Sequence, residues 1–422
     1  MILVERADSI SKDEYFNTSN NSINNKSSKN IDKNIALNKT DNITNIDNNN
    51  ISYKYNSNLY GISIQKYSNL INNTNLKNPL IAVSSINVDS NSSCNYFSIL
   101  NINETVTSLD NINNNNFVLK ELFQKDVDYP LTKVSFNYCY PDILATSDCE
   151  IKLYKINENI SNMPNYNYNN IEENISPINN FVLDSQEHNS NKISVDIITK
   201  LLISNENNSL ESNYLYPITS FDWNLYNPSL LASCSTDTTC SIWDIQANKI
   251  LTRLIAHDKE VYDISFHETE HSFLSAGADG EIRLFDLRDL DSSQIVFDTK
   301  DETALTRISV NPLNPLYVVA LCSNKSYFYI IDLRDTSGPI EIVNGHSNAV
   351  NCVQWSESNK DLFCTGSDDK SINIWDVNNI HNLDPIYTYT DNLGEVNNVF
   401  WMEDIIGIVN NNYLNIIKSN MQ

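Results

Sequence analysis

Basic residues are scarce in this chain of 422 residues, with 28 Lys and Arg against 53 Asp and Glu and a formal net charge of −25. A surplus of negative charge repels phosphate backbones and anionic lipid headgroups alike. The composition therefore argues against direct binding of nucleic acid or membranes, and it favours partners with basic surfaces.

Long apolar runs are also missing. The chain begins Met-Ile-Leu-Val before Glu5, too short a run for the apolar region of a signal peptide, and no later stretch approaches a membrane span. Eight cysteines are scattered without a Cys-x-x-Cys pair, so neither a disulfide framework nor a structural zinc site is indicated. We expect a soluble protein of the cytoplasm and nucleus that holds no cofactor or metal.

Three asparagine-rich stretches carry too little apolar surface to offset the entropy that is lost when a chain becomes ordered. They lie at residues 17–50, 112–116 and 157–180. We therefore predict a disordered tail over residues 1–50. A single domain is predicted over residues 51–418, with insertions at about 103–116 and 157–190.

Between these stretches, short runs rich in Val, Ile, Tyr, Phe and Trp alternate with turns that contain Asp, Gly, Ser and Asn, which is typical of β-strands. The pattern repeats along the chain. Four units end in aspartates that are 42, 46 and 44 residues apart, namely Asp244, Asp286, Asp332 and Asp376. This period matches the roughly 40 to 45 residues of a WD-repeat propeller blade.

The tryptophans support the same repeat. Three of the five end a first strand of a unit and two end a third strand: Trp223, Trp355 and Trp401, then Trp243 and Trp375. With three weaker units, over residues 81–100, 144–156 and 396–417, we predict an all-β fold, a seven-bladed WD-repeat propeller that is monomeric within complexes. Because open sheet edges invite aggregation, we expect residues 51–55 to supply the outer strand of the last blade and close the ring.

Four residues of the sixth unit stand where WD-repeat proteins place a hydrogen-bonded tetrad: His346, Thr365, Asp369 and Trp375. The first three could also be read as a catalytic triad. A chain of imidazole, carboxylate, hydroxyl and indole satisfies buried polar groups together, and only fragments of it recur in other units, with Phe285 in place of Trp in the fourth. We therefore predict a structural tetrad and no catalytic residue.

Residues 267–271 read His-Glu-Thr-Glu-His, a match to the His-Glu-x-x-His pattern of zinc proteases. That pattern carries its chemistry only on a helix, where both imidazoles lie on one face. Here it follows VYDISF (261–266), which alternates as a strand does, and another strand-like run follows it. We predict a turn between two strands; adventitious metal binding by His267 and His271 stays open as an alternative.

From residue 214 onward, several segments closely resemble one family: ITSFDWN (218–224), STDTTCSIWDI (235–245), IAHDKEVYDISF (255–266), GADGEIRLFDLR (277–288) and GEVNNVFW (394–401). This is the small WD-repeat family of the plant transparent testa glabra protein and its animal counterpart, a cullin-four-associated factor and adaptor for dual-specificity tyrosine-regulated kinases. The resemblance implies a non-enzymatic scaffold that brings such a kinase, transcriptional regulators, or both to their partners. The alternative is a substrate receptor of a cullin-four ubiquitin ligase.

Two units end in Asp-x-Arg, with Asp286 and Arg288 in one and Asp332 and Arg334 in the other. In cullin-four substrate receptors an Arg after the terminal Asp lies on the face presented to the ligase adaptor, so the resemblance implies partner binding at these four residues. A guanidinium fork can bind a partner's carboxylate through two hydrogen bonds. It can also pair with the aspartate of its own blade, and both readings stay open at this point.

Overall fold

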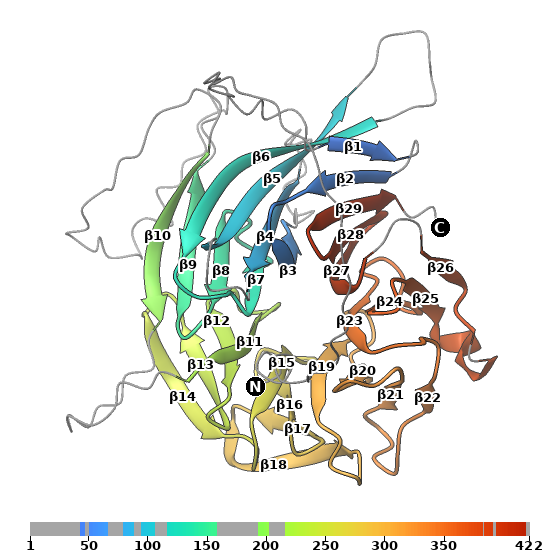
Figure 1. Ribbon diagram of the computed structural model, residues 1–422. Coiled ribbons are helices and arrows are strands. Elements are labelled where there is room, and N and C mark those ends of the chain that lie inside the picture. The colour runs from blue at the N-terminus through green and yellow to red at the C-terminus, as the bar shows by residue number, and fades with distance from the viewer. Residues whose placement is uncertain are drawn as a thin grey trace, which may run out of the picture. The chain divides into compact units, whose positions relative to one another are not determined.

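The structure is a computed structural model that describes residues 43–46, 50–65, 79–87, 94–105, 116–157, 193–201, 216–382, 384–390 and 394–418. Every described residue belongs to one compact unit, residues 41–422. In this unit seven antiparallel sheets form a ring (Figure 1), so the predicted seven-bladed propeller is confirmed. No helix among the described residues is long and apolar enough to cross a membrane.

Six blades contain four strands each, which follow one another in chain order from the axis of the ring to its rim (Figure 1). Blade 1 comprises β3 (Asn58–Ile64), β4 (Leu80–Ile86), β5 (Asn95–Thr105) and β6 (Asn116–Val127). Blade 2 comprises β7 (Lys133–Phe136), β8 (Ile143–Ser147), β9 (Ile151–Asn157) and β10 (Ser194–Leu201). Blade 3 comprises β11 (Ile218–Trp223), β12 (Leu230–Ser235), β13 (Thr239–Asp244) and β14 (Lys249–Ile255).

The following three blades have the same order of strands. Blade 4 comprises β15 (Val261–Phe266), β16 (Ser272–Gly277), β17 (Glu281–Asp286) and β18 (Asp289–Asp298). Blade 5 comprises β19 (Leu305–Val310), β20 (Tyr317–Cys322), β21 (Phe328–Asp332) and β22 (Glu341–Val343). Blade 6 comprises β23 (Val350–Trp355), β24 (Leu362–Ser367), β25 (Ile372–Asp376), the 3-10 helix η3 (Val377–Asn382) and β26 (Tyr387–Tyr389).

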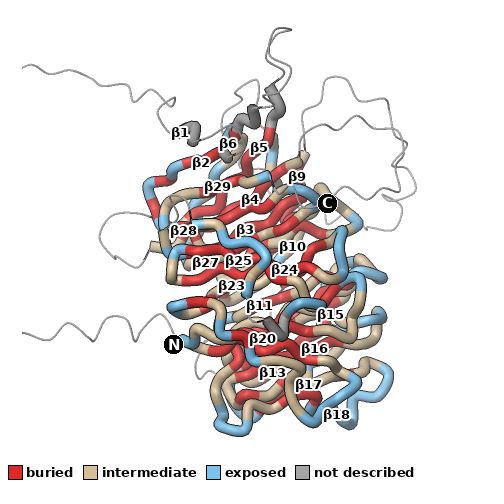
Figure 2. Tube along the Cα trace, turned by 90° about the vertical axis from the view of Figure 1, so that its right-hand side faces the viewer, coloured by how far each residue is buried: buried red, intermediate tan, exposed pale blue. Residues whose placement is uncertain are grey.

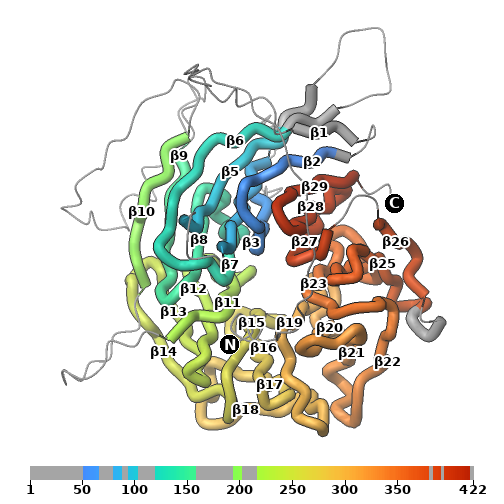
Figure 3. The backbone as a smooth tube through the Cα atoms, in the orientation of Figure 1, coloured from blue at the N-terminus to red at the C-terminus, as the bar shows by residue number. Residues whose placement is uncertain are grey.

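Blade 7 joins the two ends of the propeller. Its inner strands β27 (Val396–Met402), β28 (Ile405–Asn410) and β29 (Tyr413–Lys418) come from the C-terminal side of the chain. Strand β2 (Asn50–Lys54) pairs antiparallel with β29, with Tyr53 opposite Leu414, and Figure 3 shows the two strands side by side. The predicted closing strand is therefore confirmed.

Strand formation reaches further into the asparagine-rich stretches than the sequence predicts. Strand β1 (Ile43–Ile46) pairs with β2 inside the stretch that the sequence predicts to be a disordered tail, since the free edge of β2 offers backbone groups that a β-branched segment can pair with. Likewise β5 and β6 extend into both ends of the predicted 103–116 insertion. Residues 106–115 and 158–192 lie outside the described residues.

Each interface between neighbouring blades holds its own cluster of buried apolar side chains, which gives seven clusters for seven interfaces. All five tryptophans are at most 1% exposed. Figure 2 shows buried stretches running through the blades, whereas the outer strand β18 is exposed over most of its length. Because full burial of a large apolar side chain contributes about 1.5–3 kcal/mol, the repeated aromatics stabilise the ring at every interface they reach.

Inner-strand aspartates add hydrogen bonds between blades. Asp222 Oδ2 accepts a hydrogen bond from the Phe266 amide at 2.9 Å, and Asp263 Oδ2 accepts one from the Ile308 amide at the same distance. Each hydrogen bond links one blade to the next, so these carboxylates stabilise the packing of neighbouring blades. Their place in the repeats, SFDW and YDIS, thus has a structural reason.

Candidate protein-docking face

At one end of blades 3 to 6, the loops after the first strands meet the loops after the third strands. We name this surface the Asp-x-Arg face and define it by residues 224–229, 267–271, 287–288, 311–316, 333–340 and 356–361. Backbone hydrogen bonds fix the loops to one another, from the Leu287 amide to the His271 carbonyl at 2.7 Å and from the Leu333 amide to the Leu316 carbonyl at 2.9 Å. The face therefore presents its side chains from a rigid base.

In blade 4, Arg288 pairs with the aspartate of its own Asp-x-Arg motif. Its Nε donates to both oxygens of Asp286, at 2.9 and 3.2 Å, its Nη2 donates to Oδ2, and its amide donates to Oδ1 at 3.0 Å. Hydrogen bonds from the Arg288 side chain and amide lower the pKa of Asp286 to about 2. The aspartate is therefore ionised at physiological pH and orients the guanidinium.

Blade 5 repeats this geometry. Arg334 Nε donates to the two oxygens of Asp332 at 2.9 and 3.1 Å, and the Arg334 amide donates to Oδ1 at 3.0 Å. The guanidinium also lies 6.0 Å from the centre of the Tyr317 ring, within reach of a cation–π attraction. Hydrogen bonding from Arg334 lowers the pKa of Asp332.

The structure thus places each arginine against the aspartate of its own blade, which is the second of the two arrangements that the sequence left open. The side chains of Arg288 and Arg334 nevertheless stay 68% and 60% exposed. A guanidinium carries five N–H donors, and each pair uses only one edge of the fork. Two exposed cations in matching orientations therefore lie on neighbouring blades of this face.

Exposed apolar side chains share the face, and the sequence reasoning missed them. Tyr226 is 61% exposed and Leu313 is 51% exposed, each in the loop after a first strand. A signal for them exists in the sequence, since both lie inside an Asn-x-x-x-Pro repeat that begins at Asn224 and Asn311. Aromatic and arginine side chains together are typical of protein interfaces.

The asparagines of this repeat fasten each loop to the next blade. Asn224 Nδ2 donates to the Glu270 carbonyl at 3.0 Å, and Asn311 Nδ2 donates to the Lys360 carbonyl at 2.6 Å. His267 takes the same place in blade 4, where its Nε2 donates to the Pro315 carbonyl at 2.9 Å. We name these contacts the loop clasps.

The loop clasp explains the His-Glu-Thr-Glu-His sequence. Residues 267–271 connect β15 to β16, as predicted, and they lie on no helix. The Nε2 of His267 is occupied by its carbonyl partner, and burial lowers the pKa of this imidazole. His271 contacts Glu270 at 3.4 Å instead, so the geometry favours a neutral structural histidine over a metal ligand.

In blade 6 the four tetrad residues form one chain of hydrogen bonds. Trp375 Nε1 donates to Thr365 Oγ1 at 2.8 Å, Thr365 lies 2.7 Å from His346 Nε2, and His346 Nδ1 lies 2.9 Å from Asp369 Oδ2. With Nδ1–H donating to the carboxylate, the hydroxyl proton of Thr365 is committed to Nε2. Thr365 is fully buried, an arrangement that suits structure and not nucleophilic attack.

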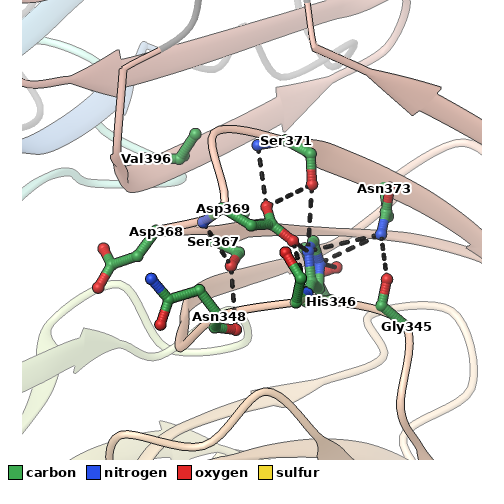
Figure 4. A network of polar contacts seen from close by, with 12 residues as sticks. Gly345, His346, Asn348, Ser367, Asp368, Asp369, Ser371, Asn373 and Val396 are labelled. Atoms are coloured by element: carbon green, nitrogen blue, oxygen red, sulfur yellow. Dashed lines mark hydrogen bonds and ion pairs between the residues drawn. The ribbon is translucent and has the colours of Figure 1, made fainter.

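Further polar groups complete this network (Figure 4). Burial opposes ionisation of Asp369, but hydrogen bonds from His346, from the Ser371 hydroxyl and from the Ser347 amide outweigh it, so the pKa of Asp369 falls well below its usual range. Asn373 Nδ2 donates to the Gly345 carbonyl at 3.0 Å.

Blade 4 has a reduced version of the tetrad. His257 Nδ1 lies 2.9 Å from Asp279 and its Nε2 lies 2.7 Å from Ser275, while Phe285 stands where blade 6 has Trp. His257, Asp279 and Glu281 are also the group of described residues that comes within metal-ligand spacing. Glu281 forms an ion pair with Arg283 at 2.6 Å, so each of the three side chains has a hydrogen-bond or ion-pair partner within the protein.

Comparison with known proteins agrees with the fold. The family model "WD domain, G-beta repeat" matches residues 208–244, 248–286 and 337–376, which contain the first three strands of blades 3, 4 and 6 together with β14 and β22. The E3 ubiquitin-protein ligase COP1 of Arabidopsis thaliana is 27% identical over 43% of this chain and 26% of its own length. A WD repeat-containing protein of Saccharomyces cerevisiae is 34% identical over 38% of this chain and 35% of its own length.

One relative is matched over most of its length. The DDB1- and CUL4-associated factor 7 homolog of Dictyostelium discoideum is 39% identical over 237 residues, which are 55% of this chain and 71% of that protein. A shared propeller and this degree of identity mark the chain as a protein-interaction scaffold. The chain belongs to the WD-repeat adaptor family of DDB1- and CUL4-associated factor 7.

Proposed function

We propose that the chain is a non-enzymatic adaptor of the cytoplasm and nucleus, which docks onto a ligase adaptor of the DDB1–CUL4 type through the Asp-x-Arg face. The observation that carries this proposal is the matched pair of exposed guanidiniums, Arg288 and Arg334, on neighbouring blades. The name of the Dictyostelium relative supports the choice of partner.

The in-blade pairing helps such docking. Because Asp286 and Asp332 hold the guanidinium planes, less side-chain entropy is lost when a partner's carboxylate or carbonyl binds the free edge of each fork. Tyr226 and Leu313 supply apolar contact on the same face. A partner that covers the face would therefore bury an aromatic group as well as oriented cations, which is the composition of binding hot spots.

The proteins that the adaptor would present follow from the family resemblance. It implies a dual-specificity kinase and its substrates, and it extends to transcriptional regulators through the plant member. A net charge of −25 suits partners with basic surfaces. If the chain serves a kinase without any ligase, it is a kinase scaffold, and this is the second candidate function.

Affinity purification of the full chain from its native cell separates the two candidates. We expect cullin-four ligase components in the eluate, and we expect their loss with Arg288→Ala plus Arg334→Ala. The control is Arg253→Ala plus Lys259→Ala, which removes two cations paired with Asp237 and Glu302 at the other end of the blades. Recovery of a kinase without ligase components would reject ligase docking and leave the kinase scaffold.

A further inference from the structure

Two neighbouring blades begin with nearly the same short sequence. Residues 129–132 read Tyr-Pro-Leu-Thr and precede β7, and residues 216–219 read Tyr-Pro-Ile-Thr and enter β11. A hydrogen bond of 2.7 Å from Thr132 Oγ1 to the Ile218 carbonyl joins the two segments. Both lie where first strands begin, so they are at the end of the blades opposite the Asp-x-Arg face.

The tyrosines of these segments face solvent. Tyr129 is 59% exposed and Tyr216 is 57% exposed, and neither hydroxyl forms a hydrogen bond with a described residue. The fold does not demand an aromatic residue at this position, because Lys259 and Asn348 occupy it in blades 4 and 6. The aromatic pair is therefore a feature of blades 2 and 3 that packing leaves unexplained.

Two acidic residues come just before Tyr129 in the sequence. Asp126 and Asp128 are both exposed, and with Cys94, Asn95 and Val127 they line a shallow pocket of about 330 Å³ at the end of blade 1. Among the described residues, neither carboxylate takes part in an ion pair. We name the surface formed by Asp126, Asp128, residues 129–132 and residues 216–219 the Tyr-Pro face.

We propose that the Tyr-Pro face binds a basic, arginine- or lysine-containing segment of a partner protein. The chemistry is complementary: tyrosine rings attract cations over their faces, and guanidinium groups also stack on them. Exposed carboxylates beside the rings pair with further cations and repel phosphate groups, so a nucleic acid or an anionic membrane does not fit the same surface.

The contact between the two segments suggests the form of the partner segment. Thr132 Oγ1 donates to the Ile218 carbonyl, so the two segments touch, and an extended chain rises about 3.3 Å per residue. One extended segment with a basic residue at every third position can therefore offer a cation to each ring. The proposal does not depend on ligase docking, since it uses a separate surface of the propeller.

Fluorescence anisotropy with the full chain tests the proposal. The probe is a labelled peptide of about twelve residues made of Arg-Ala-Ser repeats, which puts a cation at about every 10 Å of extended chain. Because an exposed cation–π contact contributes about a 2–5-fold change in affinity, we expect Tyr129→Ala plus Tyr216→Ala to weaken binding about 4–25-fold. Tyr387→Ala, which removes a half-exposed aromatic side chain on the outer strand β26 of blade 6, should leave binding unchanged.

Charge variants distinguish specific binding at the Tyr-Pro face from non-specific attraction of the peptide to the negative net charge. Asp126→Asn plus Asp128→Asn should weaken binding several-fold, whereas Asp289→Asn plus Asp291→Asn, two exposed aspartates with the same spacing at the start of β18, should not. Equal weakening by both pairs, or no effect of the tyrosine variants, would overturn the proposal. All the changes are at exposed positions, and an unchanged melting temperature verifies the fold of each variant.

Discussion

The loop clasp of His267 allows a quantitative test of how the ring is held together. In His267→Ala the Pro315 carbonyl loses its donor. A hydrogen bond contributes about 0.5–1.5 kcal/mol net, and a buried acceptor left alone costs about 1–3 kcal/mol. Because His267 is only partly buried, water can replace part of the loss, and we expect a destabilisation of about 1–2 kcal/mol.

The companion variant is His267→Asn, which places in blade 4 the residue that Asn224 and Asn311 provide at the same position. Its amide can donate to Pro315, so we expect a stability within about 0.5 kcal/mol of the wild type. His271→Asn, in the same turn but without a clasp, is the control. Urea unfolding followed by the fluorescence of the buried tryptophans measures all three, and equal destabilisation by both His267 variants would refute the clasp.

The wild type and His267→Asn should also differ in how their stability depends on pH. Burial lowers the pKa of folded His267 below the ordinary value of about 6.5 that it has when unfolded. The unfolded chain then binds more protons between the two values, so stability rises with pH there. The contribution of neutral His267 is full above about pH 6.5 and declines as pH falls below it, and His267→Asn should remove this decline. Parallel pH profiles of the two proteins would contradict the assignment.

Three further changes test the architecture. Thr365→Val removes the hydroxyl that joins the imidazole and the indole of the blade 6 tetrad, and urea unfolding should show a loss of about 2–4 kcal/mol, while Thr365→Ser should lose much less. Gly345→Ala places a methyl group against the Trp375 indole of the same tetrad and should lower the free energy of unfolding by about 1–3 kcal/mol. Gly338→Ala is its control, because no atom lies within 4 Å of the added methyl group. Deleting residues 1–55 removes β2 and should abolish cooperative thermal unfolding, which deletion of residues 1–42 should preserve.

The repeat made the fold predictable from the sequence. The period of 42 to 46 residues predicted the length of a blade, and tryptophans at two repeat positions predicted where strands end. The closing strand followed from the need to cover an open sheet edge. Both inferences need only the period of the repeat and the rule that open sheet edges are covered. Neither needs the position of a side chain.

The details of the site depend on choices that periodicity does not record. Whether Arg288 pairs with Asp286 or points to a partner is decided by local side-chain geometry, and the structure shows the pairing. The exposure of Tyr226 and Leu313 depends on how the loops pack. The loop clasp escaped notice because histidine replaces asparagine in one blade, so the repeated contact has no single repeated residue.

The most direct test of the adaptor function is the affinity of the purified full chain for a purified ligase adaptor of the DDB1 type. An interface arginine that acts as a hot spot contributes about 2 kcal/mol or more, which corresponds to about 30-fold in Kd. We predict that Arg288→Ala plus Arg334→Ala weakens binding by at least about 100-fold, while Arg253→Ala plus Lys259→Ala changes it less than about threefold. Unchanged affinity in the first variant would contradict docking through the Asp-x-Arg face.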